Sequence, residues 1–342
     1  MEEIKKYGYV IVTDYVPANA GRDVSDELQE IILSHPNRTI YFPDGEYLLS
    51  KPIATPANPA HSVSLELSNY AVLRATEDWT EQEALVRLGA AEPFNDITTP
   101  GSNYSFSGGI VDGAGKANGI SIDSGRETAI RNVSIKNTII GIHIKWGANN
   151  RSSDADISGV NIVGCASKDS IGVLMEGHDN TLTNMRIYRV HKGIVLNSGG
   201  NMLRNIHPLY GFANELADEE NYLTSVAFED HWNDNYYDIC YSDQFCTGFS
   251  LQTSSANIYT NSYIMWYSPK GGREVAFKVE GKFNSIIRSP RVNFLKETEN
   301  VLLTVSEPGG CGILENPMTN PDVIGDRQYE EYLVGRVLAK KL

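Results

Sequence analysis

A short strand motif recurs along the chain, in most copies led by glycine. Its seven copies are GISID from Gly119, GIHIK from Gly141, GVLME from Gly172, GIVLN from Gly193, SVAFE from Ser225, GFSLQ from Gly248 and EVAFK from Glu274. Successive copies start 22, 31, 21, 32, 23 and 26 residues apart, which indicates a short period with loop insertions. No 3.6-residue period runs through the copies, so helical solenoids are excluded.

A second set of short strands precedes these copies, and each contains an asparagine at a corner: Asn132, Asn184, Asn205 and Asn261. Strands this short, separated by one-residue corners, cannot pair as local hairpins. They can pair in parallel with the equivalent strand of the next repeat, about 4.8 Å away. Asparagine suits such corners because it tolerates left-handed backbone conformations. The pattern predicts an all-β fold, a right-handed parallel β-helix solenoid.

The N-terminal region predicts a helix before the first coil. In the stretch RDVSDELQEIILSHPNRTIYFPDGEYLL, Asp23 or Ser25 is the expected N-cap, and an apolar stripe follows. The stripe consists of Leu28, Ile31 and Ile32. A helix over the open end of a β-helix would protect unpaired strand groups, so we expect a capping helix here.

We expect a single β-helix domain over residues 1–342. Within it, an N-terminal strand and the capping helix occupy 1–38, coils occupy 39–310, and a C-terminal cap occupies 311–342. The tail predicts a terminal helix that caps the last coil or joins a neighbouring subunit. Its expected inward residues are Tyr329, Tyr332, Leu333 and Val337.

Two segments carry a resemblance to a known superfamily. IYFPDGEYLLSKPI after the predicted helix, and GGIVDGAGKANGISI from Gly108, resemble the pectate-lyase-like parallel β-helix superfamily. The resemblance implies a carbohydrate-active protein, but it does not fix the reaction. The superfamily includes glycoside hydrolases, polysaccharide lyases, epimerases, fructotransferases and phage tailspikes. A shorter segment, KDSIGVLMEGHDN, is similar to inulin fructotransferases, in which acidic residues flank such a strand.

The composition narrows the class of partner. A net charge of −14 disfavours nucleic acid, and it would repel an acidic polysaccharide except at a local basic pocket. No stretch of about 18 apolar residues predicts a membrane span. The four cysteines form no CxxC motif, and we expect neither a metal nor a cofactor. The charged N-terminus is that of a cytoplasmic protein or of a secreted one whose export signal has been removed.

The outward positions of the repeated strands bring distant residues into columns. In the glycine-led copies, the second and fourth residues after glycine face outward. We expect the fourth-position column to contain Asp123, Lys145, Glu176, Asn197 and Glu229 in this order. Carboxylates two coils apart leave room for water, as in inverting glycoside hydrolysis. The alternative is a solvated ladder of surface ion pairs.

These columns and their turns supply the candidate residues. The catalytic candidates are Glu176, Asp169, Glu229, His143, Lys145 and Asp123. The substrate-binding candidates are Trp146, His178, Asp179, Arg186, His191, Lys192, Asp230, His231, Trp232 and Asp243. The two tryptophans suit a sugar-binding groove, because sugar faces pack on aromatic rings, although a buried loop-filling role is the alternative.

Three functions stay open from the sequence. The first is a glycoside hydrolase or glycan transferase acting on an oligo- or polysaccharide through Glu176 with Asp169 or Glu229. The second is a uronate lyase or epimerase built on His143, Lys145, His191 or Lys192, with Arg186 and His207 near the last two. The calcium cluster that a lyase would use is not evident. The third is a non-catalytic glycan-binding or tailspike-like module. The resemblance also implies a homotrimer.

Overall fold

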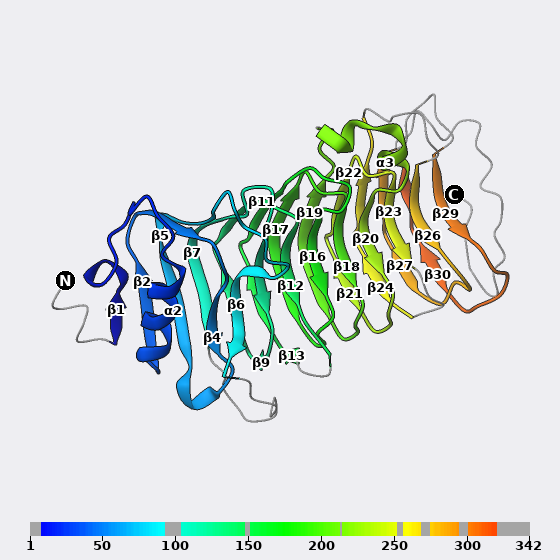
Figure 1. The fold of residues 1–342 in the computed structure, drawn as a ribbon. Coiled ribbons are helices and arrows are strands. Elements are labelled where there is room, and N and C mark those ends of the chain that lie inside the picture. The colour runs from blue at the N-terminus through cyan, green and yellow to red at the C-terminus, as the bar shows by residue number, and fades with distance from the viewer. Residues whose placement is uncertain are drawn as a thin grey trace. The chain divides into compact units, whose positions relative to one another are not determined.

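The computed structural model describes residues 8–92, 104–147, 151–212, 214–251, 256–267, 274–293 and 300–319. The predicted C-terminal helix lies outside these residues. The chain forms two compact units, each built of parallel β-helix coils (Figure 1). The N-terminal unit comprises residues 1–165 and 172–181, and the C-terminal unit comprises 166–171 and 182–342. The single-domain organisation stays a prediction.

Strands of the N-terminal unit pair in parallel along three faces. The first face contains β1 (Tyr9–Ile11), β2 (Arg38–Phe42), β5 (Val63–Ala75), β7 (Ser105–Asp112), β10 (Ala129–Arg131) and β14 (Asp156–Ser158). The second contains β3 (Gly45–Leu49), the later halves of β5 and β7, β11 (Ser134–Thr138) and β15 (Asn161–Gly164). The third contains β4 (Ile53–Pro56), β6 (Ala84–Ala91), β8 (Asn118–Ile122), β12 (Ile140–Ile144) and β16 (Ile171–Met175). β9 (Gly125–Arg126) pairs with β13 (Ser152–Ser153).

The C-terminal unit repeats this plan. Its first face contains β17 (Thr181–Tyr188), β19 (Met202–Leu209), β21 (Tyr236–Asp238), β24 (Ile258–Thr260), β27 (Ile286–Arg288) and β30 (Ile313–Glu315). The second contains the later halves of β17 and β19, β22 (Tyr241–Asp243), β25 (Tyr263–Met265), β28 (Arg291–Asn293) and β31 (Met318–Thr319). The third contains β18 (Lys192–Leu196), β20 (Val226–Asp230), β23 (Thr247–Leu251), β26 (Val275–Val279) and β29 (Val301–Val305). The fold is the predicted right-handed parallel β-helix.

Inward side chains stack on their equivalents in neighbouring coils. The rings of Phe228, Phe249 and Phe277 lie one above another, with centroid separations of 4.6 and 5.0 Å and interplanar angles of 6° and 12°. These separations match the strand spacing, because each ring belongs to one rung of the third face. The inward stacking expected from the repeat is therefore present in the core.

The helix α2 (Ser25–Ser34) is the predicted capping helix, and it packs against β4. Leu28, Ile31 and Ile32 are buried, as the apolar stripe predicted. The side-chain amide of Gln29 binds the edge strand β4 in the manner of another strand. Its Nε2 donates to the carbonyl of Ala54 at 2.9 Å, and its Oε1 accepts from the N–H of Ala54 at 2.7 Å. The helix thus satisfies polar groups at the open edge.

The predicted N-cap of this helix is wrong, because Val24 occupies that position without a side-chain hydrogen bond. Asp23 instead ties the helix to the end of β3. Its carboxylate accepts from the backbone N–H groups of Ser25 at 3.1 Å and Ser50 at 2.9 Å. Burial would raise the pKa of Asp23, but these bonds and those from the two serine hydroxyls lower it to about 2.

The corner asparagines adopt the expected left-handed conformation. Asn132, Asn184, Asn205 and Asn261 have φ angles of 54°, 55°, 53° and 51°. In the coil between Asn205 and Asn261, Ile239 adopts the same conformation. Its φ is 54° and its side chain is about half exposed. A β-branched residue is strained in this region, whereas asparagine tolerates it.

We predict that Ile239→Asn stabilises the protein by about 1 kcal/mol, because it removes this backbone strain. The substitution loses little apolar burial, since the side chain of Ile239 is about half exposed. Urea unfolding measures the change. The reciprocal variant Asn261→Ile should be destabilised by a similar amount. Equal midpoints for Ile239→Asn and the parent chain would contradict the assignment of strain.

Candidate active site

Three of the predicted catalytic residues lie in one outward column of the N-terminal unit. The backbone N–H groups of Asp123, Lys145 and Glu176 each donate to a carbonyl of the preceding coil's strand, at 2.8, 2.9 and 2.8 Å. Each residue therefore occupies the same position one coil further along. The structure places this part of the predicted column as expected, with Lys145 between the two carboxylates.

Asp123 is fully buried beneath two cations. Its Oδ2 lies 2.6 Å from Arg87 Nη2 and 3.2 Å from Lys145 Nζ, and its Oδ1 accepts from the hydroxyl of Ser121. Burial would raise the pKa of Asp123, but the hydrogen bonds from Arg87 and Ser121 and the charges of Arg87 and Lys145 lower it. Asp123 is thus a fixed carboxylate that organises cations, out of contact with solvent.

A polar pocket of about 220 Å³ adjoins this group. It is lined by Gln82, Glu83, Ala84, Asn118, Ser121, Ile140, His143 and Lys145. The ammonium of Lys145 also contacts the carboxylate of Glu83, whose side chain is 39% exposed. The pocket therefore holds an accessible carboxylate, which Asp123 does not provide.

His143, which lines this pocket, forms a hydrogen-bonded pair with Glu176. His143 Nε2 lies 3.0 Å from Glu176 Oε2, and their side chains are 19% and 35% exposed. Because both are in partial contact with solvent, the pair can exchange a proton with a ligand. Nearby in sequence, Trp146 is 38% exposed and meets the ring of His178 edge-on, with centroids 5.1 Å apart.

The strand register of the C-terminal unit corrects the predicted place of Glu229. Glu229 pairs with Val195 and Ser250, in the column of second positions. The fourth position, beside Asn197, belongs to His231, whose N–H donates to the carbonyl before Asn197 at 2.8 Å. The copies SVAFE and EVAFK have no leading glycine. Their alanines pair with the glycines of the other copies, so an alignment by first residue is two residues out of register.

Glu229 forms an ionic group with Lys192 and His231. Its Oε2 lies 2.6 Å from Lys192 Nζ and its Oε1 lies 2.9 Å from His231 Nε2. Burial would raise the pKa of the Glu229 carboxyl, but the hydrogen bonds from His231 and Lys192 and the charge of Lys192 lower it to about 2. Glu229 stays ionised and cannot serve as a proton donor near neutral pH.

His191 is buried next to this group, and its Nε2 lies 3.2 Å from the hydroxyl of Thr224. Burial and the charge of Lys192 lower the pKa of His191, so its ring is neutral near pH 7. Asp169 is exposed, and its charge acts on His191 in the opposite direction. A neutral imidazole cannot neutralise a uronate.

Asp230 does not fit its predicted substrate-binding role. Its side chain is buried and accepts hydrogen bonds from Tyr237 at 2.6 Å, from Asn235 at 3.0 Å and from Asn257 at 3.0 Å. Burial raises the pKa of Asp230 to about 6, against the effect of these bonds. Trp232, two residues later, is 49% exposed, as a sugar-stacking residue should be.

Three candidates remain, Asp179, Asp243 and Arg186. Asp179 is exposed at a left-handed corner. Asp243 is buried on the second face of the C-terminal unit, where His207 Nε2 lies 3.4 Å from its Oδ2 and the His207 ring stacks on Tyr241. Arg186 is exposed on β17 and precedes His207 by 21 residues in the sequence. The same separation joins Asn184 and Asn205, which are hydrogen-bonded to each other.

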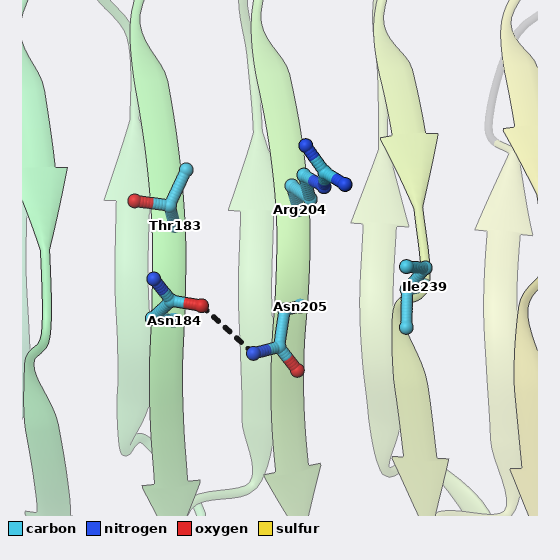
Figure 2. Close-up of a pocket in the computed structure, with 5 residues that line it drawn as sticks. All are labelled: Thr183, Asn184, Arg204, Asn205 and Ile239. Atoms are coloured by element: carbon cyan, nitrogen blue, oxygen red, sulfur yellow. Dashed lines mark hydrogen bonds between the residues drawn. The ribbon is translucent and has the colours of Figure 1, made fainter.

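A second pocket, of about 490 Å³, lies on the first face of the C-terminal unit (Figure 2). It is lined by Thr183, Asn184, Arg204, Asn205 and Ile239, the strained corner residue. In Figure 2 the amide of Asn205 donates to that of Asn184, at 2.8 Å. It contains no carboxylate or imidazole, so it offers no acid–base group.

Sequence reasoning missed Glu83 and Arg87. Glu83 lies just before β6 and Arg87 lies within it. The sequence of β6, ALVRLGAA, lacks the leading glycine of the repeat. The register Arg87↔Ser121↔His143 shows that β6 belongs to the same series of coils. Extending the repeat N-terminally by its inward apolar residues would have found both.

Among the residues that the structure describes, no helix is long and apolar enough to cross a membrane. Within the same ranges, no group of three or more histidine, cysteine, aspartate or glutamate residues is arranged to hold a metal ion.

No protein-family model and no curated protein matches the chain. Solved structures do. They include a mutant tailspike protein of E. coli bacteriophage HK620 (TM-score 0.60, 11% identity, covering 94% of this chain and 64% of that one). An alginate lyase from Paenibacillus sp. str. FPU-7 is also similar (TM-score 0.58, 14% identity, covering 83% of this chain and 97% of that one). A third is the endo-xylogalacturonan hydrolase from Aspergillus tubingensis (TM-score 0.58, 13% identity, covering 92% of this chain and 94% of that one).

These similarities bear on the fold. The chain spans less than two thirds of the tailspike protein's length, whereas it matches nearly the whole of the two enzymes. At such identities the likeness shows the parallel β-helix and nothing of the reaction. The predicted parallel β-helix fold is confirmed.

We predict that the Glu229 ion pairs stabilise the fold in a pH-dependent manner. Because the pKa of Glu229 falls from its ordinary 4.5 to about 2 in the folded chain, the contribution is present above about pH 4.5 and is lost as the pH falls toward 2. The difference in unfolding free energy between the parent chain and Glu229→Gln should therefore shrink from about pH 7 to about pH 3. A constant difference would contradict the assigned ionisation.

Proposed function

We propose that the protein is a carbohydrate-active enzyme that hydrolyses or transfers a glycosidic bond of an uncharged oligo- or polysaccharide. The observation that carries this is the partly exposed His143–Glu176 pair at a polar pocket that also contains Glu83. Glycosidic cleavage needs a proton donor for the leaving oxygen and a carboxylate for the anomeric carbon or for water. The similar solved structures named as glycan-cleaving enzymes support the same class.

In this proposal Glu176 donates the proton and later recovers it. Its hydrogen bond to His143 orients the carboxyl group and links it to the pocket. Glu83, ion-paired with Lys145, is the second carboxylate and acts on the anomeric carbon or on water. Asp123 positions Arg87 and Lys145 but touches no substrate, because it is fully buried.

The distribution of charge favours an uncharged glycan over a uronate. Arg87 and Lys145 are bound to Asp123 and Glu83, and Lys192 is bound to Glu229. A lyase needs an uncompensated cation to neutralise the uronate carboxylate before proton abstraction. These three cations are already paired, which weakens the lyase or epimerase alternative.

Tailspike-like glycan binding without turnover and assembly as a homotrimer stay predictions. Mass analysis of products from a panel of oligosaccharides separates the classes. Hydrolysis adds water to the product, transfer adds none, and elimination creates a double bond that absorbs in the ultraviolet.

We predict that Glu176→Gln lowers kcat by at least about 100-fold, because the amide cannot transfer the proton. The matched control is Glu280→Gln, since Glu280 is also ion-paired and its side chain is 37% exposed, against 35% for Glu176. The control should keep full activity. Both variants should unfold at the same temperature as the parent chain.

The proposal is wrong if Glu176→Gln keeps full turnover. Glu83→Gln then tests the second role. It should lower kcat by a comparable factor, whereas a purely structural ion pair would change the unfolding temperature and leave kcat in place.

A further inference from the structure

The C-terminal unit presents an exposed indole beside a buried ionic group. Trp232 is 49% exposed, whereas the side chain of Glu229 is only 9% exposed between Lys192 and His231. Neither the proton donor nor the second carboxylate of the proposed reaction belongs to this group. We propose that Lys192, Glu229, His231 and Trp232 form a glycan-binding subsite that holds an uncharged sugar without cleaving it.

The ionic group supplies hydrogen-bonding capacity for sugar hydroxyls. A carboxylate can accept about four hydrogen bonds, and the described contacts give each oxygen of Glu229 one partner, Lys192 Nζ for Oε2 and His231 Nε2 for Oε1. The ammonium of Lys192 has three donors and a side chain that is 33% exposed. Hydroxyl groups both donate and accept, so a sugar can bind the carboxylate and the ammonium together.

Two hydrogen bonds fix the backbone that carries the indole. The N–H of Trp232 donates to the buried carboxylate of Asp230 at 3.0 Å, and its carbonyl accepts from the amide of Asn257 at 3.0 Å. Asp230 therefore acts as a positioning residue for this platform. A rigid aromatic surface binds a sugar face with little loss of conformational entropy.

Gly199 lets the indole lie close to the neighbouring coil. A Cβ atom on Gly199 would come within 2.7 Å of Trp232 Cδ1 and 2.4 Å of the carbonyl oxygen of Asn233. The position thus has no room for a side chain. The ring packs against the backbone on one side and keeps about half of its surface in solvent.

The same contacts explain why this subsite binds without catalysis. Glu229 is held ionised, with its pKa lowered to about 2, so it has no proton to give to a leaving group. Its charge and that of Lys192 compensate each other, so no net cation is left for a uronate. An uncharged sugar is the ligand that this chemistry favours.

This inference rests on the proposed function, and its test measures binding apart from turnover. The probes are neutral oligosaccharides (xylo-, manno-, gluco- and fructo-oligosaccharides) and an oligogalacturonate. Binding is measured by calorimetry in the Glu176→Gln background, so that no probe is consumed. We expect a neutral probe to bind and the oligogalacturonate not to bind.

The decisive variant is Trp232→Ala, which should weaken binding of that probe by about tenfold or more. In the active parent chain the same change should leave kcat within about threefold. Gly199→Ala, which substitutes none of the proposed contact residues but displaces the ring and the neighbouring Asn233 carbonyl, should weaken binding as well. The matched control is Tyr236→Ala, which removes a side chain that is 46% exposed on another face and should change neither value.

Three results would overturn the subsite: no probe binds, Trp232→Ala binds like its parent, or Trp232→Ala lowers kcat as strongly as Glu176→Gln. Binding by the parent chain with no turnover of any probe has a different meaning. It would remove the proposed reaction and leave the subsite standing.

Discussion

Parallel hydrogen bonding between equivalent strands of successive coils determines which side chains become neighbours in each unit. Every coil advances by one strand spacing, so residues twenty to thirty positions apart come to lie side by side. The stacked rings of Phe228, Phe249 and Phe277 show the inward result of this repetition. The column of Asp123, Lys145 and Glu176 shows the outward result. The core and the candidate site thus depend on the same backbone register.

Close columns of charged residues have a chemical consequence. Where a carboxylate is buried among cations, as Asp123 and Glu229 are, its pKa falls and it loses the capacity to donate a proton. Where it keeps contact with solvent and an imidazole, as Glu176 does with His143, proton exchange stays possible. Burial and pairing, rather than residue type, therefore separate structural carboxylates from candidate catalytic ones.

The interior of the C-terminal unit contains a buried polar network, and this network holds the backbone of an exposed residue in place. Asp230 lies among Tyr237, Asn235 and Asn257, and it also fixes the backbone of the exposed Trp232. A buried polar network of this kind is stable only when its members are hydrogen-bonded. Here the network fixes the backbone of Trp232, the proposed ligand platform, and so links a core residue to the outer face.

The amino-acid sequence alone determined the fold, because glycine-led strands and corner asparagines such as Asn205 repeat with a period that only a parallel solenoid satisfies. It also brought Asp123, Lys145 and Glu176 into one column. The tertiary structure alone decided the register of Glu229 and which carboxylates are buried. A repeat pattern gives spacing along the chain, whereas a two-residue shift in pairing or a cation packed over a carboxylate depends on contacts between distant coils.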